Sequence, residues 1–373
     1  MSLEQPKFEK SLEPREQWLD SAKQAIKEQE LAIDLSVPPY KAFQGEGDRF
    51  FVQKCIDKVG REVVVKVSSP EEETKKALEK EGVIYDLVQK SVDQFEKDSK
   101  EKLQIHFPQK LGEFNYSEQK GIIINYIKDD KEAMANLSPQ EKIDLISLVL
   151  SEMHKLPVPE EETTKPYEKR AIEVLNADEH KKRWHYYVPD LVANGIVSKD
   201  DGKTLLNAIE KNKDLIGNYP LKLDHGDVHA GNIAYSRDKE AGKAIITLMD
   251  LEALKLDNEF SGIAHIVNQE DIFKQLQNSP KLSEILKIFP QGQKSVDLLR
   301  GGGITQKLEE DFVLNSGNPQ SAERMYRLIR MGDALEQLHY YSCEMKSGAY
   351  KILQEGYQKI LEEQIKMLPK KEK

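Results

Sequence analysis

The sequence predicts an α+β protein of two lobes, in which a small antiparallel sheet precedes a larger, mainly helical part. Runs of β-branched and aromatic residues, separated by short turns, fill residues 37–67 and 110–127, as is typical of hairpin strands. From residue 128 onward helical patterns dominate, interrupted by one later pair of short apolar runs. We therefore expect an N-lobe over residues 1–127 and a C-lobe over residues 128–373.

Length and composition narrow the class of protein. A chain of 373 residues is long enough to bury a substantial core in two lobes. Its net charge of −10 argues against a nucleic-acid partner, which would require a basic face. Cys55 and Cys343 are the only cysteines, so we expect neither a disulfide framework nor a Cys-based zinc site. Without a long apolar run or a signal-peptide core, the expected location is cytoplasmic, with no membrane partner.

The first lobe carries two features of possible chemical interest. After a helical pattern within residues 1–36, Gly45 and Gly47 lie in a turn between two expected strands. Glycines there would let backbone N–H groups approach phosphates, and their position in front of the strand with Lys66 favours a phosphate loop over the alternative of an ordinary hairpin turn. The third strand, residues 62–67, has Lys66 inside an apolar run. Such a lysine either lies on an edge strand or points into a polar site.

The elements that follow Lys66 complete the lobe. An acid-rich helix is expected over residues 70–88 and contains Glu79 and Glu81. Residues 89–103 are highly charged and indicate either a loop or a solvated extension of that helix. Two further strands are expected at 110–115 and 121–127, the second buried because its apolar run is almost continuous.

The second lobe begins with a clear helix start. Ser138, Pro139 and Glu141 occupy the N-cap, first and third positions of a helix that should end near Leu156. Residues 157–220 are expected to be mostly helical, and an amphipathic helix over residues 321–367 should close the lobe.

The chemically informative stretch is the loop HGDVHAGN, residues 225–232, with the hairpin that follows it. Two short apolar runs, 232–236 and 244–249, flank a polar turn and predict a β-hairpin. The second run ends at Asp250, beside the place where the loop began. Asp227, Asn232 and Asp250 are therefore expected to converge at one end of the hairpin.

Phosphoryl transfer uses three groups of these kinds. An Asp accepts the proton of the attacking hydroxyl, while an Asn and a second Asp hold the magnesium ions that bridge the nucleotide phosphates. Asp-x-x-x-x-Asn alone is more often a capped polar loop. The His-Gly before Asp227 and the hairpin after Asn232 favour the phosphoryl-transfer interpretation here.

HGDVHAGN followed by LMDLEAL resembles the signature of the aminoglycoside phosphotransferase and choline kinase-like family, small-molecule kinases with a protein-kinase-like fold. The sequence departs from that signature at Ala230, where Pro is usual, and at Leu251, where an aromatic residue is common. Gly262 stands where the family often has an Asp that anchors the segment after the hairpin, so we expect a local rearrangement there.

The resemblance implies a role for each candidate residue. Asp227 would be catalytic, and Asn232 and Asp250 would hold Mg²⁺. The resemblance also implies an ATP site. Lys66 would contact the α- and β-phosphates and pair with Glu81, with Glu79 as the rival for that pairing. Gly45 and Gly47 would form the phosphate loop, and a hinge of Asn125, Tyr126 and Ile127 would contact adenine through main-chain atoms.

The implied function is transfer of the γ-phosphoryl group of ATP to a hydroxyl of a small molecule, such as an aminoglycoside, an amino alcohol or a sugar. The acids Glu252, Asp257 and Glu259 favour a cationic or neutral acceptor over an anionic one. Aromatic faces for a cation could come from Trp184, Tyr186 and Tyr187, whose commoner fate is packing.

Two alternatives remain open. A nucleotide-binding pseudokinase or scaffold would use the same fold without turnover. A metallophosphoesterase would use His225, Asp227 and His229 as metal ligands, although the sequence lacks the further Asp, Asn and His clusters that a dinuclear site needs.

Overall fold

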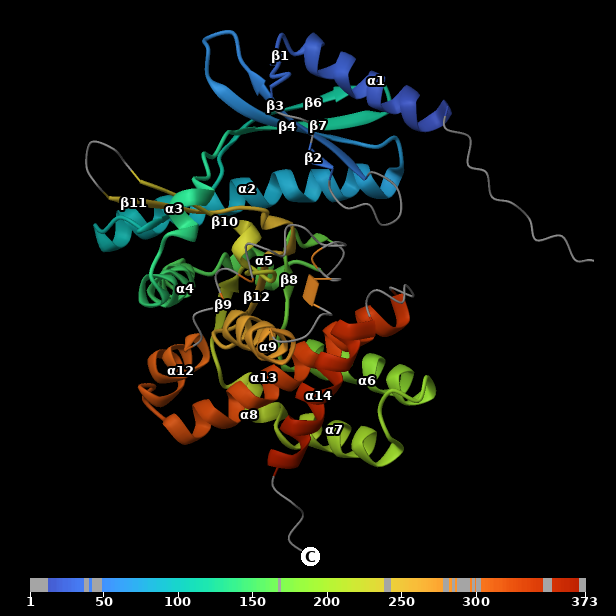
Figure 1. Cartoon of the computed structure of the whole chain (residues 1–373), viewed down its shortest axis with the longest axis vertical. Coiled ribbons are helices and arrows are strands. Elements are labelled where there is room, and N and C mark those ends of the chain that lie inside the picture. Colours follow the sequence, from blue (N-terminus) through green and yellow to red (C-terminus); the bar gives the residue numbers. More distant parts are fainter. Residues whose placement is uncertain are drawn as a thin grey trace, which may run out of the picture. The chain divides into compact units, whose positions relative to one another are not determined.

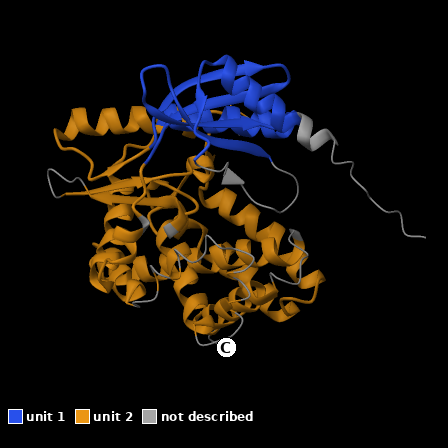
Figure 2. Ribbon diagram, turned by 45° about the horizontal axis from the view of Figure 1, so that its top comes forward, with its two compact units in different colours: residues 1–87, 108–127 blue, residues 88–107, 128–373 orange. Residues whose placement is uncertain are grey.

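The computed structural model describes residues 13–36, 40–41, 49–166, 169–237, 243–277, 282–283, 286, 296, 299, 303–344 and 351–368. Gly45 and Gly47, the predicted phosphate loop, lie outside the described residues, as does most of the polar turn within the hairpin. The chain divides into two compact units, residues 1–87 with 108–127 and residues 88–107 with 128–373 (Figure 2).

One stretch of the expected N-lobe belongs to the second unit. Residues 88–107 cluster there because strand β5 (Ile105–His106) pairs in parallel with β11 (Ala244–Leu248). The remaining boundary between the units falls at residue 127, where the sequence pattern changes from strands to helices.

Unit 1 is built on an antiparallel sheet in the order β1-β3-β4-β7-β6, with β2 added to β3. Its strands are β1 (Ala32–Ile33), β2 (Tyr40–Lys41), β3 (Phe50–Ile56), β4 (Glu62–Ser68), β6 (Lys110–Tyr116) and β7 (Gln119–Asn125). This sheet and the mainly helical unit 2 confirm the predicted α+β class.

Helix α1 (Glu13–Glu28) covers one face of the sheet in unit 1 (Figure 1). Ala22, Ala25 and Ile26 form one hydrophobic cluster with the alternate β4 residues Val63, Val65 and Val67. Because side chains alternate along a strand, Lys66 must point to the opposite face. Since β4 pairs with a strand on each side, Lys66 is not an edge-strand lysine.

Helix α2 (Glu72–Ser99) extends well beyond the predicted end at residue 88. Of the two interpretations of residues 89–103, the helical extension is therefore the correct one as far as Ser99. The helix ends before Lys100, whose φ of 60° places it in the left-handed conformation that commonly follows a helix.

Unit 2 begins with α3 (Lys131–Ala135) and α4 (Pro139–Lys155). The predicted capping box is present: the N3 amide of Glu141 donates to Ser138, and the Glu141 carboxylate accepts from the Ser138 N–H. The predicted helical region then comprises α5 (Glu160–Thr164), α6 (Ala177–Ala193), α7 (Lys199–Lys211) and α8 (Lys213–Gly217).

Two small sheets carry the loop and the hairpin. One has the order β8-β12-β9, formed by β8 (Glu173–Val174), β12 (Lys255–Asn258) and β9 (Leu221–Asp224). The other joins β5 to the predicted hairpin, formed by β10 (Ile233–Arg237) and β11. Short 3₁₀ helices η2 (Ala230–Asn232) and η3 (Leu251–Ala253) precede β10 and follow β11.

Helix α9 (Ser261–Leu276) is the central helix of unit 2, since every residue from Ser261 to Asn268 is buried. It packs against α13 (Pro319–His339) and α14 (Lys351–Met367), and the segment α12 (Ile304–Leu308) with η4 (Glu309–Leu314) lies beside it (Figure 1). The amphipathic helix predicted over residues 321–367 is divided: α13 gives way to a π-helical turn, η5 (Tyr340–Glu344), before α14 begins. Within the described ranges, no helix has the length and apolar character needed to cross a membrane.

The capping box gives a stability prediction. Ser138→Ala removes the side-chain acceptor for the Glu141 N–H, so we expect the free energy of unfolding in urea to fall by about 1 kcal/mol. Ser138→Thr keeps the acceptor and should stay close to the wild type. Equal stability of the Ala and Thr variants would contradict the capping role.

Candidate active site

The loop 225–232 is fixed against the end of the hairpin by backbone contacts. His225 donates from Nε2 to the Met249 carbonyl at 2.7 Å, and the Met249 N–H donates to the Asn232 carbonyl at 2.7 Å. Gly226 has a φ of 78°, and a Cβ there would lie 2.0 Å from the Ala253 oxygen. Only glycine permits this approach. Asp227, Asn232 and Asp250 therefore belong to one corner of unit 2, which we call the loop–hairpin corner.

Asp227 is half-exposed and lies among three polar side chains. His229 Nε2 is 3.5 Å from Oδ2, His265 Nε2 is 3.6 Å from Oδ1, and Asn232 Nδ2 is 3.3 Å from Oδ2. Burial acts to raise the pKa of Asp227, but its contacts with His229 and His265 outweigh this and hold the pKa below the ordinary value. The carboxylate is thus ionised and able to accept a hydrogen bond from a hydroxyl.

The oxygen atoms of Asn232 and Asp250 fit a magnesium site. Asn232 Nδ2 donates to the Asp227 carbonyl at 2.9 Å, which leaves Oδ1 as the atom that could hold a cation. Asp250 is exposed, and its carboxylate makes no capping bond to η3. One amide and one carboxylate suit Mg²⁺, which completes its octahedron with waters and phosphate oxygens.

Asp250 also has an unusual backbone. Its φ and ψ are 56° and 66°, in the left-handed region that costs a non-glycine residue free energy. The neighbouring contacts of His225 and Asn232 with Met249 hold this conformation in place. The strain is therefore stored at the position where the sequence predicts a metal ligand.

The two histidines of the loop are engaged in holding its shape. His225 is buried and donates to Met249, and burial lowers its pKa. The Gly231 N–H donates to His229 Nδ1 at 2.9 Å, so the ring's proton lies on Nε2, which faces Asp227. Neither ring is arranged as a metal ligand together with Asp227. No cluster of three or more His, Cys, Asp or Glu suited to a metal occurs in the described parts of the chain.

Lys66 and Glu81 lie together in unit 1. Lys66 Nζ is 2.6 Å from Glu81 Oε2, and Tyr85 donates to Glu81 Oε1 at 3.1 Å. The rival Glu79 instead forms an ion pair with Lys120. Lys66 Nζ also lies 4.4 Å from the centre of the Phe50 ring, so its charge is held over an aromatic face.

Two N–H groups of the predicted hinge already donate hydrogen bonds within unit 1. The Asn125 N–H donates to the Gln109 carbonyl at 3.1 Å, and the Tyr126 N–H donates to the Glu62 carbonyl at 3.2 Å. Lys54 Nζ covers the Tyr126 ring at 4.4 Å. The N–H groups of Asn125 and Tyr126 are therefore already used within unit 1.

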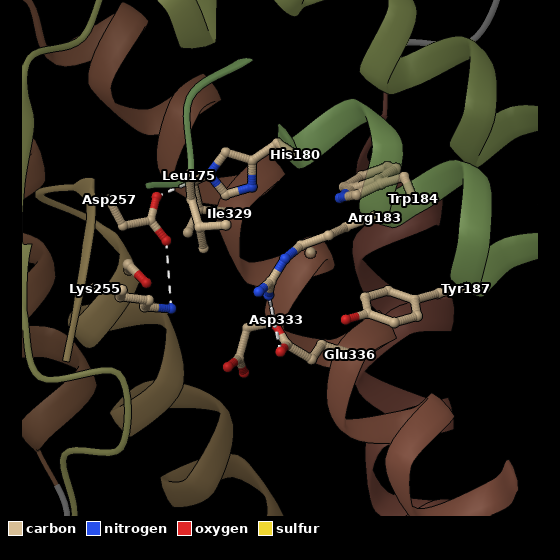
Figure 3. Close-up of a pocket in the computed structure, with 12 residues that line it drawn as sticks. Leu175, His180, Arg183, Trp184, Tyr187, Lys255, Asp257, Ile329, Asp333 and Glu336 are labelled. Atoms are coloured by element: carbon tan, nitrogen blue, oxygen red, sulfur yellow. Dashed lines mark hydrogen bonds and ion pairs between the residues drawn. The ribbon is translucent and has the colours of Figure 1, made fainter. Parts of the chain in front are cut away.

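A polar cavity of about 30 Å³ lies within unit 2, between α6, β12 and α13 (Figure 3). Charged residues that line it pair with one another. Arg183 makes two hydrogen bonds to Glu336, at 2.9 and 2.8 Å, and Lys255 lies 3.4 Å from Asp257. A volume of about 30 Å³ is enough for about one or two waters and is too small for a sugar or an amino alcohol.

Three solved structures resemble the chain over most of its length. APH(2")-IIa, in its complex with streptomycin and ATP, is 15% identical with a TM-score of 0.52, over 93% of this chain and 97% of that one. Wild-type aminoglycoside 2'-phosphotransferase-IIIa with GDP is 12% identical with a TM-score of 0.54, over 94% and 98%. A putative fructosamine-3-kinase from Haemophilus somnus 129PT is 13% identical with a TM-score of 0.51, over 92% and 97%.

The chain has the aminoglycoside phosphotransferase fold. The resemblance seen in the sequence is thereby confirmed for the fold, and structural similarity at such low sequence identity establishes the fold alone. No protein-family model and no curated protein sequence matches the chain.

At Gly262, where the sequence predicts a local rearrangement, the residue packed against the glycine is Asp224, which was not singled out from the sequence. Asp224, buried at the end of β9, accepts the Gly226 N–H at 2.7 Å and so supports the loop. A Cβ at position 262 would lie 2.8 Å from Asp224 Oδ2 and 2.8 Å from Leu150 Cδ2. The carboxylate of Asp224 therefore fills the space into which a side chain at 262 would point. The sequence signal that could have pointed to Asp224 is its position directly before His225 and Gly226.

His265 and Asp333 were also missed. His265 Nδ1 lies 2.9 Å from Asp333 Oδ1, while Nε2 of the same ring faces Asp227. Asp333 is 68 residues further along the chain, on α13. No local motif announces a contact between residues so far apart in sequence.

The close packing at Gly262 predicts a steric cost. Gly262→Ala forces its methyl group against Asp224 and Leu150, and such overpacking typically lowers the free energy of unfolding by about 1–3 kcal/mol. The matched control is Gly217→Ala in α8, where the nearest atom to the new Cβ is 3.8 Å away and helix propensity favours Ala. Thermal or urea unfolding that ranks Gly262→Ala as stable as Gly217→Ala would refute the packing argument.

Proposed function

We propose that the protein is an ATP-dependent phosphotransferase that moves the γ-phosphoryl group to a hydroxyl of a small molecule. The observation that carries the proposal is the loop–hairpin corner, where the Asp227 carboxylate, the Asn232 amide and the Asp250 carboxylate are held together by main-chain contacts. The fold supports it, since solved proteins of this fold include phosphotransferases in complexes with ATP or GDP.

In this proposal Asp227 is the catalytic residue. Its half-exposed carboxylate accepts a hydrogen bond from the acceptor hydroxyl and takes the hydroxyl proton as the oxygen attacks phosphorus. His229 and Asn232 lie on its Oδ2 side and His265 on its Oδ1 side. Because both sides are bounded by donors, the carboxylate is limited to one orientation.

Asn232 and Asp250 would hold Mg²⁺ through Asn232 Oδ1 and the Asp250 carboxylate. Bound Mg²⁺ would neutralise the charge that develops on the transferring phosphoryl group and its leaving oxygen. Lys66, kept in place by Glu81, would add a positive charge for the α- and β-phosphates. Gly45 and Gly47, and main-chain groups near Ile127, are the proposed contacts for the remaining parts of ATP.

The proposed acceptor is a small hydroxylated compound, cationic or neutral rather than anionic. Support for this charge preference comes from Asp227 itself, from the exposed Glu252, and from the half-buried Glu259. The buried Asp257 contributes nothing, since it is paired with His180 and Lys255. An anionic acceptor would approach Asp227 and the nucleotide phosphates against like charge.

The aromatic residues considered for a cationic acceptor are mostly used in packing. Trp184 is buried, and Tyr186 and Tyr187 contact each other and the His339 ring, with centroids 5.0–5.6 Å apart. Tyr186 alone of the three is well exposed, at 61%. The preference for a cation therefore depends on acids rather than on an aromatic cage.

The alternative of a pseudokinase is disfavoured by the intact set of Lys66, Asp227, Asn232 and Asp250. The metallophosphoesterase alternative is disfavoured because His225 and His229 are engaged in holding the loop.

The proposal is tested by incubating the protein with Mg²⁺ and γ-labelled ATP or GTP against matched panels of aminoglycosides, amino alcohols, sugars, sugar acids and peptides. We expect label on a small hydroxylated compound from the first three panels. Nucleotide binding without labelling of any panel would support a pseudokinase, and labelling of sugar acids or peptides would contradict the acceptor class alone.

The catalytic role of Asp227 gives a second test. Asp227→Asn keeps the shape of the side chain but removes its basicity, and we expect turnover to fall by about 10²- to 10⁴-fold with nucleotide affinity retained. Asp200→Asn, at the exposed start of α7, is the control for loss of a negative charge. Turnover of Asp227→Asn near that of Asp200→Asn would remove Asp227 from the role of base.

A further inference from the structure

A chain of buried polar groups leads from Asp227 into the interior of unit 2. His265 on α9 is 7% exposed and lies between two carboxylates. Its Nδ1 is 2.9 Å from Asp333 Oδ1, and its Nε2 is 3.6 Å from Asp227 Oδ1. Since Asp333 can only accept, Nδ1 carries a proton, and Nε2 is the atom that faces the proposed base.

Asp333 is itself fixed by a second set of contacts. Asn268 Nδ2 donates to Asp333 Oδ2 at 2.7 Å and to the Arg330 carbonyl at 3.1 Å. Arg330 donates from Nε to Asn268 Oδ1 at 3.0 Å and from Nη2 to Asp271 at 2.6 Å. This network joins α9 to α13, so that His265 meets a carboxylate with little freedom to move.

We propose that His265, oriented by Asp333, is a positioning residue that fixes the Asp227 carboxylate for its encounter with the acceptor hydroxyl. The inference rests on the proposed function, since it gives Asp227 the role of base. No bond is made or broken at His265: the proton of the hydroxyl goes to Asp227, and His265 keeps its own protons. The aspartate–histidine–aspartate order gives the ring a carboxylate on each side.

The charges around His265 favour its protonated form. Burial acts to lower the pKa of His265, but Asp333 and Asp227 raise it to about 10. The other titratable groups near this cluster are His229 in the loop, Tyr357 on α14, Arg330 on α13 and Lys255 on β12. The pKa of Tyr357 is raised well above its ordinary value, so this group stays neutral. An imidazolium between two carboxylates is the arrangement that balances the buried charge.

Gln269 completes the environment of the ring. Gln269 Nε2 lies 2.8 Å from His265 Nε2, and a flip of the carboxamide places its oxygen there to accept the Nε2–H, while Asp227 lies on the same side. In that orientation Nε2 is shared between a neutral and a charged acceptor. Without the imidazolium, Asp227 Oδ1 would lose the positive charge that lies 3.6 Å away.

The first experiment compares His265→Gln with the wild type and with His339→Gln. Glutamine keeps an amide donor but removes the charge. His339 is a matched control, since it is buried and pairs with Asp190 at 3.2 Å without contacting Asp227. We expect kcat of His265→Gln to fall by about 10²-fold, the order of loss for a misplaced catalytic group, with the KM for ATP within about two-fold. His339→Gln should keep both constants.

The second experiment uses Asp333→Asn, which keeps the hydrogen-bond acceptor but removes one of the two charges on His265. The pKa of His265 should fall from about 10. Because the protonated ring is the working form, kcat falls as the pH rises through this pKa, so the fall should occur at a lower pH in Asp333→Asn than in the wild type. A purely structural role would reduce kcat by the same factor at every pH. Side-chain ¹⁵N NMR of the wild type should show His265 charged at pH values where an ordinary histidine is neutral.

The outcomes separate the two proposals. If the wild type transfers phosphate, two results would overturn the positioning role alone. One is a kcat of His265→Gln equal to that of the wild type. The other is an alkaline fall of kcat that occurs at the same pH in Asp333→Asn as in the wild type. An NMR titration that gives His265 an ordinary pKa also overturns it, with no variant required. A wild type that neither transfers phosphate nor hydrolyses ATP overturns the proposed function, and the positioning role with it.

Discussion

The contact between the loop and the end of the hairpin is the constraint on which the rest of the candidate site depends. His225 donates to the Met249 carbonyl, and Gly226 lies so close to Ala253 that a Cβ would overlap its oxygen. These two features fix the chain before Asp227, and the bond from the Met249 N–H to the Asn232 carbonyl fixes it after Asp227. Asp250, next to Met249, has a left-handed conformation. The conformational cost is met by packing within unit 2, so the backbone that carries Asp227, Asn232 and Asp250 is fixed without a ligand.

In the same corner, the charged side chains are paired with neighbouring polar or charged groups. Asp227 is kept ionised by His229 and His265, and Asp333 balances the charge of His265 in turn. Asp224 is satisfied by the Gly226 N–H and fills the space that Gly262 leaves open. The space beside the glycine at position 262 is thus occupied by an acid at the end of β9. Removing either partner would leave a buried charge or a void, each of which is costly.

Local patterns predicted the elements well, while contacts between distant segments could not be predicted. The capping box at Ser138, the antiparallel strands and the hairpin follow from residue spacing and turn chemistry, which act over a few residues. The α2 extension was left open because charge alone does not distinguish a solvated helix from a loop. The pairing of β5 with β11, the role of Asp224 and the contact of His265 with Asp333 depend on chain folding over tens of residues. An acid directly before His225-Gly226 was a local signal for Asp224, but one sequence carries no signal for the other two contacts.

The measurement that tests the loop–hairpin corner most directly is the calorimetric affinity for ATP, with and without Mg²⁺, of the wild type, Asp250→Asn and Glu252→Gln. Glu252 is an exposed acid two residues from Asp250, so its variant controls for the loss of charge. The account predicts that Mg²⁺ strengthens ATP binding to the wild type and to Glu252→Gln, and that Asp250→Asn loses most of this gain while its affinity for metal-free ATP is unchanged. An Asp250→Asn variant that keeps the full Mg²⁺-dependent gain would contradict the account.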